Sequence, residues 1–291
     1  MLALSACAPI VMAGTGKAGS ACIPGARVVA LDLPATDIVA FAGARLIGAA
    51  VAAQFKDGRS DVTLPADVVD IGHSAEPNLE LLQALRPDLI VSAWPLLPTS
   101  ALPRIAPVLS LPVFTAERDR YEVVANVVRT LGEHCCVAEQ AQDALAEAAG
   151  ELRRSALLIS ELRSEPVYLV YLNGDGISLR VFGEHSMLAA ILRRLGIANA
   201  WTGEDGIWGW QVCRPDVLRE RPEARIVEIT QHWDGAALPR QRLTSSPLWR
   251  SLPQIQAGRI TTLPPVAVLG GISSGLRFAS LLTRALMQAA R

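Results

Sequence analysis

Histidine is the side chain most often used for proton transfer and metal binding near neutral pH, and this chain has four. His73, His134, His185 and His232 show neither the HExxH spacing nor any close pair that would bring two imidazoles to one metal ion. The sequence also lacks the GxSxG turn of many serine hydrolases and the glycine-rich loop that binds nucleotide phosphates. We therefore expect a protein with no catalytic residues, no cofactor and no metal ligands. A metal site built from sequence-distant histidines is the alternative.

Aromatic residues are sparse in the chain but concentrated in one segment. They make up 5% of the sequence, yet three of the six tryptophans, Trp201, Trp208 and Trp210, stand in the glycine-rich stretch NAWTGEDGIWGW. Such a loop commonly presents indole faces to a ligand. We expect Trp201 to fill the core after a strand, and Trp208 and Trp210 to face a cleft.

The elements that position these tryptophans belong to a chain in which strand and helix patterns alternate. In the first half, residues 27–31, 68–72 and 89–91 form apolar, β-branched runs that are typical of strands. Helical patterns that begin near Thr36 and after Asn78 separate them. This strand–helix–strand order predicts a parallel sheet.

A proline-free helical pattern, rich in Ala, Glu, Gln and Leu, covers residues 137–162. Beyond it the alternation resumes, with strands at 167–172 and 225–229 and a helix between Ser186 and Gly196. We predict an α/β fold of two lobes with mainly parallel sheets, joined rigidly by this one helix so that opening motions are small. The expected boundaries are 22–136 for the N-terminal lobe, 137–163 for the connecting helix and 164–291 for the C-terminal lobe.

The first residues are typical of a targeting segment. Residues 1–14 are apolar or small, and Lys17 with the small residues at 18–21 resembles a cleavage region. The Leu-Ser-Ala-Cys run at 4–7 also fits a lipoprotein cleavage box. We expect residues 1–21 to be the remnant of a signal peptide, and the functional protein to be exported to the periplasm, free or lipid-anchored.

Five cysteines are present, none with the spacing of a metal site. Cys7 is expected to leave with the leader; Cys22 stands at its edge, and its removal with the leader is the alternative to its staying in the N-terminal lobe. Cys135 and Cys136 fall in a predicted helix, where we interpret them as small buried apolar residues, with a redox pair as the alternative.

Composition narrows the class of protein. The chain has 291 residues, is 51% hydrophobic and 19% charged, and carries a net charge of −1, which is typical of a folded globular protein. It has no block of basic residues, so nucleic acid is not expected as a partner.

Specific motifs occur along nearly all of the chain beyond the leader. The most distinctive lie at Gly72, at Glu76-Pro77-Asn78 and between Val181 and Trp208, and others read RPDLIVSA and SSPLWRSLPQIQAGRI. In these motifs the chain resembles the ferric-hydroxamate-binding proteins of the Fhu system, in the helical-backbone class of periplasmic binding proteins. The resemblance implies a monomeric, non-enzymatic receptor of an ABC importer that binds a ferric siderophore in a shallow cleft between two lobes.

Several ligand-contacting positions of that family carry other residues here. The family's main donor, an arginine, is replaced by Ser74, with His73 beside it, and a cleft tyrosine is replaced by Pro95, next to Trp94. Arg180 replaces a pocket leucine in the other lobe, and Trp210 a small residue. We expect the donor to have moved between lobes, and the ligand to contact Trp208, Trp210, Arg180, Ser74, His73 and Trp94.

The resemblance also implies docking of the lobe tops on a membrane permease through one acidic residue on each lobe. Asp216 occupies the position in the C-terminal lobe, whereas Ser100 occupies the one in the N-terminal lobe. Three functions stay open at this point: a receptor for a hydroxamate siderophore, the same receptor for a carboxylate or mixed-ligand siderophore, and a periplasmic siderophore hydrolase. The missing nucleophile–base motif disfavours the hydrolase.

Overall fold

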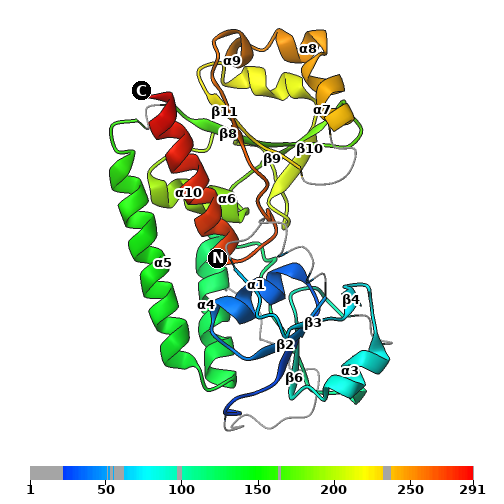
Figure 1. The fold of residues 1–291 in the computed structure, drawn as a ribbon. Coiled ribbons are helices and arrows are strands. Elements are labelled where there is room, and N and C mark those ends of the chain that lie inside the picture. The colour runs from blue at the N-terminus through cyan, green and yellow to red at the C-terminus, as the bar shows by residue number, and fades with distance from the viewer. Residues whose placement is uncertain are drawn as a thin grey trace, which may run out of the picture.

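Two lobes, each with its own five-stranded sheet, make up the protein in the computed structural model (Figure 1). The structure describes residues 22–50, 52, 55, 62–96, 100–162, 165–231 and 237–290. The predicted α/β fold class is confirmed by the two sheets and their flanking helices.

The sheet of the N-terminal lobe is parallel throughout. Its strands are arranged in the order β3-β2-β1-β6-β7. They span Val69–Asp70 (β3), Leu46–Ala49 (β2), Val28–Ala30 (β1), Leu89–Ser92 (β6) and Val108–Ser110 (β7). The helices of this lobe are α1 (Leu33–Phe41), α3 (Leu79–Leu85) and α4 (Arg120–His134), with a short hairpin of β4 (Gly72–His73) and β5 (Glu76–Pro77) and a 3₁₀ turn η1 (Leu102–Arg104).

The sheet of the C-terminal lobe is mixed, in the order β10-β9-β8-β11-β12. Its strands are β8 (Val167–Leu172), β9 (Leu179–Phe182), β10 (Trp210–Cys213), β11 (Arg225–Ile229) and β12 (Ile260–Leu263). β8, β11 and β12 are parallel, whereas β9 is antiparallel to both of its neighbours. The turn between β8 and β9 is too short for a parallel crossover, so this pair forms a hairpin.

Helices cover this second sheet. They are α6 (Met187–Leu195), α7 (Ala237–Thr244), α8 (Pro247–Arg250), α9 (Pro253–Gln256) and α10 (Ile272–Ala289), with the 3₁₀ segment η2 (Pro215–Glu220). Ser186 caps α6 by accepting a hydrogen bond from the Ala189 amide, and Gly196 ends it in the left-handed conformation, as the sequence predicted. None of the helices in the described part of the chain is long and apolar enough to span a membrane.

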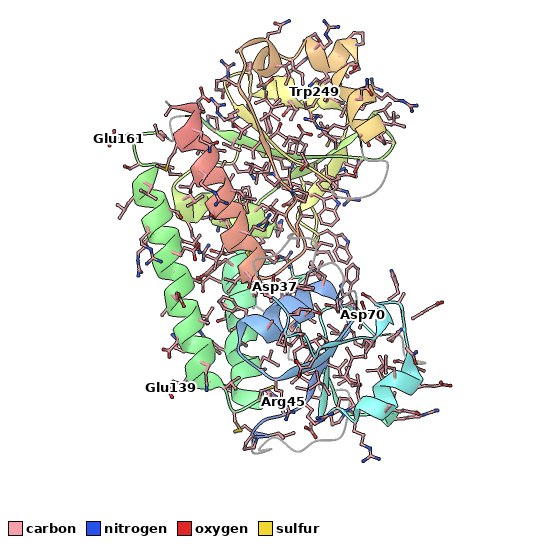
Figure 2. All side chains as sticks on the ribbon, in the orientation of Figure 1. Asp37, Arg45, Asp70, Glu139, Glu161 and Trp249 are labelled. Atoms are coloured by element: carbon pink, nitrogen blue, oxygen red, sulfur yellow. A yellow bond between two sulfur atoms is a disulfide. The ribbon has the colours of Figure 1, made fainter. Side chains whose placement is uncertain are left out.

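The long helix α5 covers Ala138–Leu158 and ends four residues before the predicted end. It runs along one side of the molecule, with Glu139 beside the lower lobe and Glu161, just after its end, beside the upper lobe (Figures 1 and 2). α5 is not the only element that contacts both lobes, because α10 packs against α1 and α4 as well as against α6 and β12. The domain boundaries given above stay a prediction.

A buried carboxylate fixes the start of α10 to the N-terminal lobe. Asp37 on α1 is fully buried and accepts hydrogen bonds from the Ser273 amide, the Ser274 amide and the Ser274 hydroxyl. Figure 2 shows Asp37 where α1 meets the first turn of α10. Burial raises the pKa of Asp37, and these hydrogen bonds oppose that shift. The Asp37 carboxyl oxygens accept hydrogen bonds from the first amides of α10, which lack partners within the helix, so the contact links the two lobes.

The interpretation of Cys136 as a helical apolar residue is wrong. α4 ends at His134, and Cys136 lies in the turn before α5 with a φ of 56°. Its side chain forms a disulfide with Cys22, which is 114 residues away in sequence. Cys22 is therefore part of the folded domain. Cys135 is buried and free, as expected of a small apolar residue.

Candidate ligand-binding cleft

Four aromatic rings from both lobes meet between the two sheets. Trp94 and Phe114 follow strands β6 and β7 of the N-terminal lobe, whereas Trp208 and Trp210 come from the C-terminal lobe. The Trp208 ring centroid lies 5.1 Å from Trp94, 4.8 Å from Phe114 and 6.3 Å from Trp210. We call these four residues the interlobe aromatic cluster. The cluster brings the expected site residues Trp208 and Trp210 of the C-terminal lobe together with the expected site residue Trp94 of the N-terminal lobe.

The position of the cluster follows from the topology of the sheets. Trp94 lies just beyond the carboxyl end of β6, and ligands of open parallel sheets bind outside the carboxyl ends of the strands. Trp94 is 38% exposed and Trp208 36% exposed, although both rings pack against other rings. The exposed part of each ring is accessible to a ligand, which could pack on it.

Asp32 fixes the backbone that carries Trp94. Its Oδ2 accepts hydrogen bonds from the Ala93 amide, the Trp94 amide and the Ser92 hydroxyl, at 2.8, 3.3 and 2.9 Å, while Oδ1 caps α1 through the Ala35 amide. Burial raises the pKa of Asp32, and the same hydrogen bonds oppose that shift. A side chain that is distant in sequence thereby sets the direction of Trp94.

Replacing Asp32 with alanine should disturb Trp94 and weaken ligand binding by about three- to tenfold, because each lost hydrogen bond contributes about 1 kcal/mol to the ordered turn. Near-ultraviolet circular dichroism would report the tryptophan environment, and a fluorescence titration the affinity. In a Trp94→Ala background the same substitution should cost no further affinity. An equal loss in both backgrounds would contradict the positioning role.

Arg180 lies on β9, on the face of the sheet that also carries Trp210. It pairs with Val212 of β10 and with Tyr171 of β8. Its guanidinium carbon lies 4.9 Å from the Trp210 ring centroid and 5.7 Å from the Tyr171 ring centroid. Its Nε is buried without a hydrogen-bond partner, and the guanidinium forms no ion pair with a described carboxylate. This cation is stacked on rings rather than neutralised.

Arg120, at the start of α4, was not expected from the sequence. It is 4% exposed and crosses between the lobes, donating hydrogen bonds from Nε to the His185 carbonyl (2.9 Å) and from Nη2 to the Ile207 carbonyl (2.5 Å). Nη1 is buried without a partner. Burial lowers the pKa of Arg120 to about 10, and the charge of Asp205 opposes that shift. The Arg120 guanidinium carbon also lies over the Phe114 ring, 5.1 Å from its centroid.

His185 and Asp205 form a polar group next to Arg120. His185 Nδ1 lies 2.6 Å from Asp205 Oδ1, its backbone amide donates to Asp205 Oδ2, and its Nε2 lies 3.2 Å from the Ala116 carbonyl oxygen of the other lobe. A small cavity is lined by Arg120, His185, Phe114 and Trp208 together with apolar residues of both lobes. In the described part of the chain, no three His, Cys, Asp or Glu side chains gather as a metal site, and His232 lies outside it.

Two further expected ligand residues lie on a short hairpin of the N-terminal lobe. His73 and Ser74 lie on the β4–β5 hairpin, where His73 Nδ1 accepts a hydrogen bond from the Ala75 amide. Among the described residues, neither forms a hydrogen bond or ring contact with the interlobe aromatic cluster. Their role stays a prediction. Trp201, as expected, fills the core at 9% exposure.

The expected docking residue is exposed on the surface of the C-terminal lobe. Asp216 is on η2, with its side chain exposed and its carboxylate 3.7 Å from Arg214 Nε. Ser100, its counterpart in the other lobe, precedes η1 and accepts a hydrogen bond from the Leu102 amide. Docking through these positions stays a prediction.

Comparisons with known proteins agree with this architecture. Residues 28–267 match the periplasmic binding protein family, and the chain belongs to that family. It is 27% identical to the iron(3+)-hydroxamate-binding protein FhuD of Escherichia coli K12, over 92% of this chain and 90% of FhuD. The resemblance to ferric-hydroxamate-binding proteins that the sequence motifs indicated is thereby confirmed.

Solved structures extend the comparison to the fold. FhuD of Vibrio cholerae, solved with Fe³⁺–Desferal, is similar with a TM-score of 0.80 and 26% identity, covering 90% of this chain and 98% of that one. SirA of Staphylococcus aureus, solved with staphyloferrin B, shares the fold with a TM-score of 0.65 and 19% identity, over 92% and 95% of the two chains. These similarities confirm the two-lobed fold.

Proposed function

We propose that this protein is the substrate-binding protein of an ABC importer and that it binds a ferric hydroxamate siderophore between its lobes. The observation that carries the proposal is the interlobe aromatic cluster with the stacked cation Arg180 beside it. The names of the two FhuD relatives, one of them solved with Fe³⁺–Desferal, support the same ligand class.

The chemistry of such a ligand suits these residues. A ferric tris-hydroxamate already chelates its iron, so the receptor needs apolar walls and a few hydrogen-bond donors rather than metal ligands. The exposed faces of Trp94 and Trp208 supply the walls. Arg180 supplies in-plane donors to the oxygens around iron, which the short Ser74 hydroxyl cannot replace. A carboxylate siderophore is the second candidate, because a guanidinium also binds carboxylates bidentately.

Export to an oxidising compartment is part of the proposal. The Cys22–Cys136 disulfide supports it, because such bonds form and persist in the periplasm and are rare in the cytosol. The disulfide begins at the first described residue, directly after the expected leader. A monomer that carries its ligand to a membrane permease completes the proposed role.

Thermal unfolding with and without ligand tests this function. A ferric hydroxamate at 100 times its dissociation constant should stabilise the protein by about 2.7 kcal/mol and raise the unfolding midpoint accordingly. The metal-free siderophore should raise it much less, and the ferric complex should be recovered chemically intact. Recovery of a cleaved ligand would favour the hydrolase, and no shift with any ferric siderophore would overturn the receptor.

Asp216→Ala should lower siderophore uptake in cells and leave ligand affinity unchanged, because charges at a docking surface guide association without shaping a distant pocket. Radiolabelled iron uptake and a titration of the purified protein measure the two effects. Asp143→Ala, which removes an exposed carboxylate on α5, is the matched control. Loss of ligand affinity in Asp216→Ala would show that the docking role is wrong.

A further inference from the structure

A continuous stack of rings with an arginine at each end crosses the interface between the lobes. Arg120 lies over Phe114, Phe114 packs on Trp208, Trp208 on Trp210, and Trp210 under Arg180. The successive separations are 5.1, 4.8, 6.3 and 4.9 Å. The row of rings therefore has a cation at each end, buried Arg120 in the N-terminal lobe and half-buried Arg180 in the C-terminal lobe.

The described carboxylates near this stack are engaged elsewhere. Asp205 accepts from the ring and the backbone amide of His185, and it is the charge that acts on buried Arg120. Glu184 pairs with Arg118 on the surface. Arg180 makes no ion pair with any carboxylate in the described part of the chain, and its Nε has no hydrogen-bond partner. Within the described residues, no carboxylate compensates the positive charge at Arg180.

The net charge of the proposed ligand is set at its periphery. One Fe³⁺ and three hydroxamate anions sum to zero, so a tris-hydroxamate complex carries only the charge of its side arms. An ammonium arm would be repelled by Arg180, and a carboxylate arm attracted to it. At a separation of about 7 Å and an effective dielectric constant of about 60, one charge changes the affinity by about three- to tenfold at low salt.

We propose that this cleft selects among ferric siderophores by the charge of their side arms, preferring complexes with an anionic arm to those with a cationic one, and that Arg180 is the residue that discriminates. This inference rests on the proposed receptor function, and it concerns the arm of the ligand rather than the groups that chelate iron. The V. cholerae relative, solved with Fe³⁺–Desferal, shows that the fold accepts a cationic arm. The preference would thus be a property of this chain's own residues.

Three ferric ligands with the same iron-binding groups test the inference. They are desferrioxamine B, whose arm ends in an ammonium group, its N-acetyl derivative, which is neutral, and its N-succinyl derivative, which ends in a carboxylate. Tryptophan fluorescence titrations at low salt should rank them succinyl, acetyl, then unmodified, with about a 10- to 50-fold span across two charges. The span should shrink at 1 M salt, where the screening length falls to about 3 Å.

Three variants assign the preference to Arg180. Arg180→Gln should compress the span to less than about threefold, Arg180→Lys should keep the order because it keeps the charge, and Arg250→Gln on the exposed surface of α8 should change nothing. A span that survives in Arg180→Gln, or unmodified desferrioxamine binding as tightly as the succinyl form, would overturn charge selection. Equal binding of all three ligands would leave the receptor function intact, whereas no binding of any would overturn both.

Discussion

Arg180→Leu should weaken binding of a ferric hydroxamate by about 10- to 150-fold, because a hydrogen bond from a charged group contributes about 1.5–3 kcal/mol. Arg180 stacks on Trp210 and has no carboxylate partner among the described residues, so its donors are available to a ligand. Burying the oxygens around iron without such a donor would leave their negative charge poorly satisfied. A fluorescence or calorimetric titration measures the loss directly.

Two matched variants separate this role from general effects. Ser74→Ala removes only a short neutral donor from the β4–β5 turn and should cost far less affinity than Arg180→Leu. Arg250→Leu makes the same chemical change at an exposed position of α8 and should cost none. Parent-like binding by Arg180→Leu, with an unchanged unfolding midpoint, would end the idea that this arginine replaces the family's missing donor.

Cys136→Ser should lower the free energy of unfolding by about 4–5 kcal/mol. The Cys22–Cys136 disulfide closes a loop of 114 residues, and the chain-entropy model gives about 4.7 kcal/mol for a loop of 100. Without it the first described residues keep only the Ile23 amide hydrogen bond to the His134 carbonyl as a link to the end of α4. Urea unfolding followed by tryptophan fluorescence measures the change.

The free cysteine Cys213 supplies the control for this stability prediction. It is partly buried on β10 and belongs to no disulfide, so Cys213→Ser should leave the urea midpoint nearly unchanged. A reducing agent should bring the parent down to the stability of Cys136→Ser and leave that variant unaffected. An equal response of parent and variant to reduction would show that the bond does not form in solution.

Local patterns in the sequence were sufficient for much of the fold. Asn78 and Ser186 accept hydrogen bonds from the amides of Leu81 and Ala189, at the helix starts that their residue types predicted. The glycine-rich loop with Trp208 and Trp210 indicated a ligand surface, because several indoles in an otherwise aromatic-poor chain are unusual. These features depend on neighbours in sequence, which is why they could be read without a structure.

The remaining features depend on residues that are far apart in sequence. Arg120 contacts the carbonyls of His185 and Ile207, 65 and 87 residues away, and no spacing rule connects them. Phe114 joins the interlobe aromatic cluster only because the lobes face each other, and Asp32 reaches Trp94 across two adjacent strands. The pairing of Cys22 with Cys136 likewise follows from the path of the chain, since cysteine positions alone do not define connectivity.

The position of iron in a crystal of the ferric complex tests the receptor account most directly. Anomalous scattering at the iron absorption edge locates the metal without reference to the shape of the ligand. The account predicts one strong peak between the lobes, with the ligand in contact with Trp94 and Trp208 and within hydrogen-bond reach of Arg180. A peak elsewhere, for example at the cavity lined by Arg225 and Leu286 beyond the end of α5, or iron bound directly by protein side chains, would contradict it.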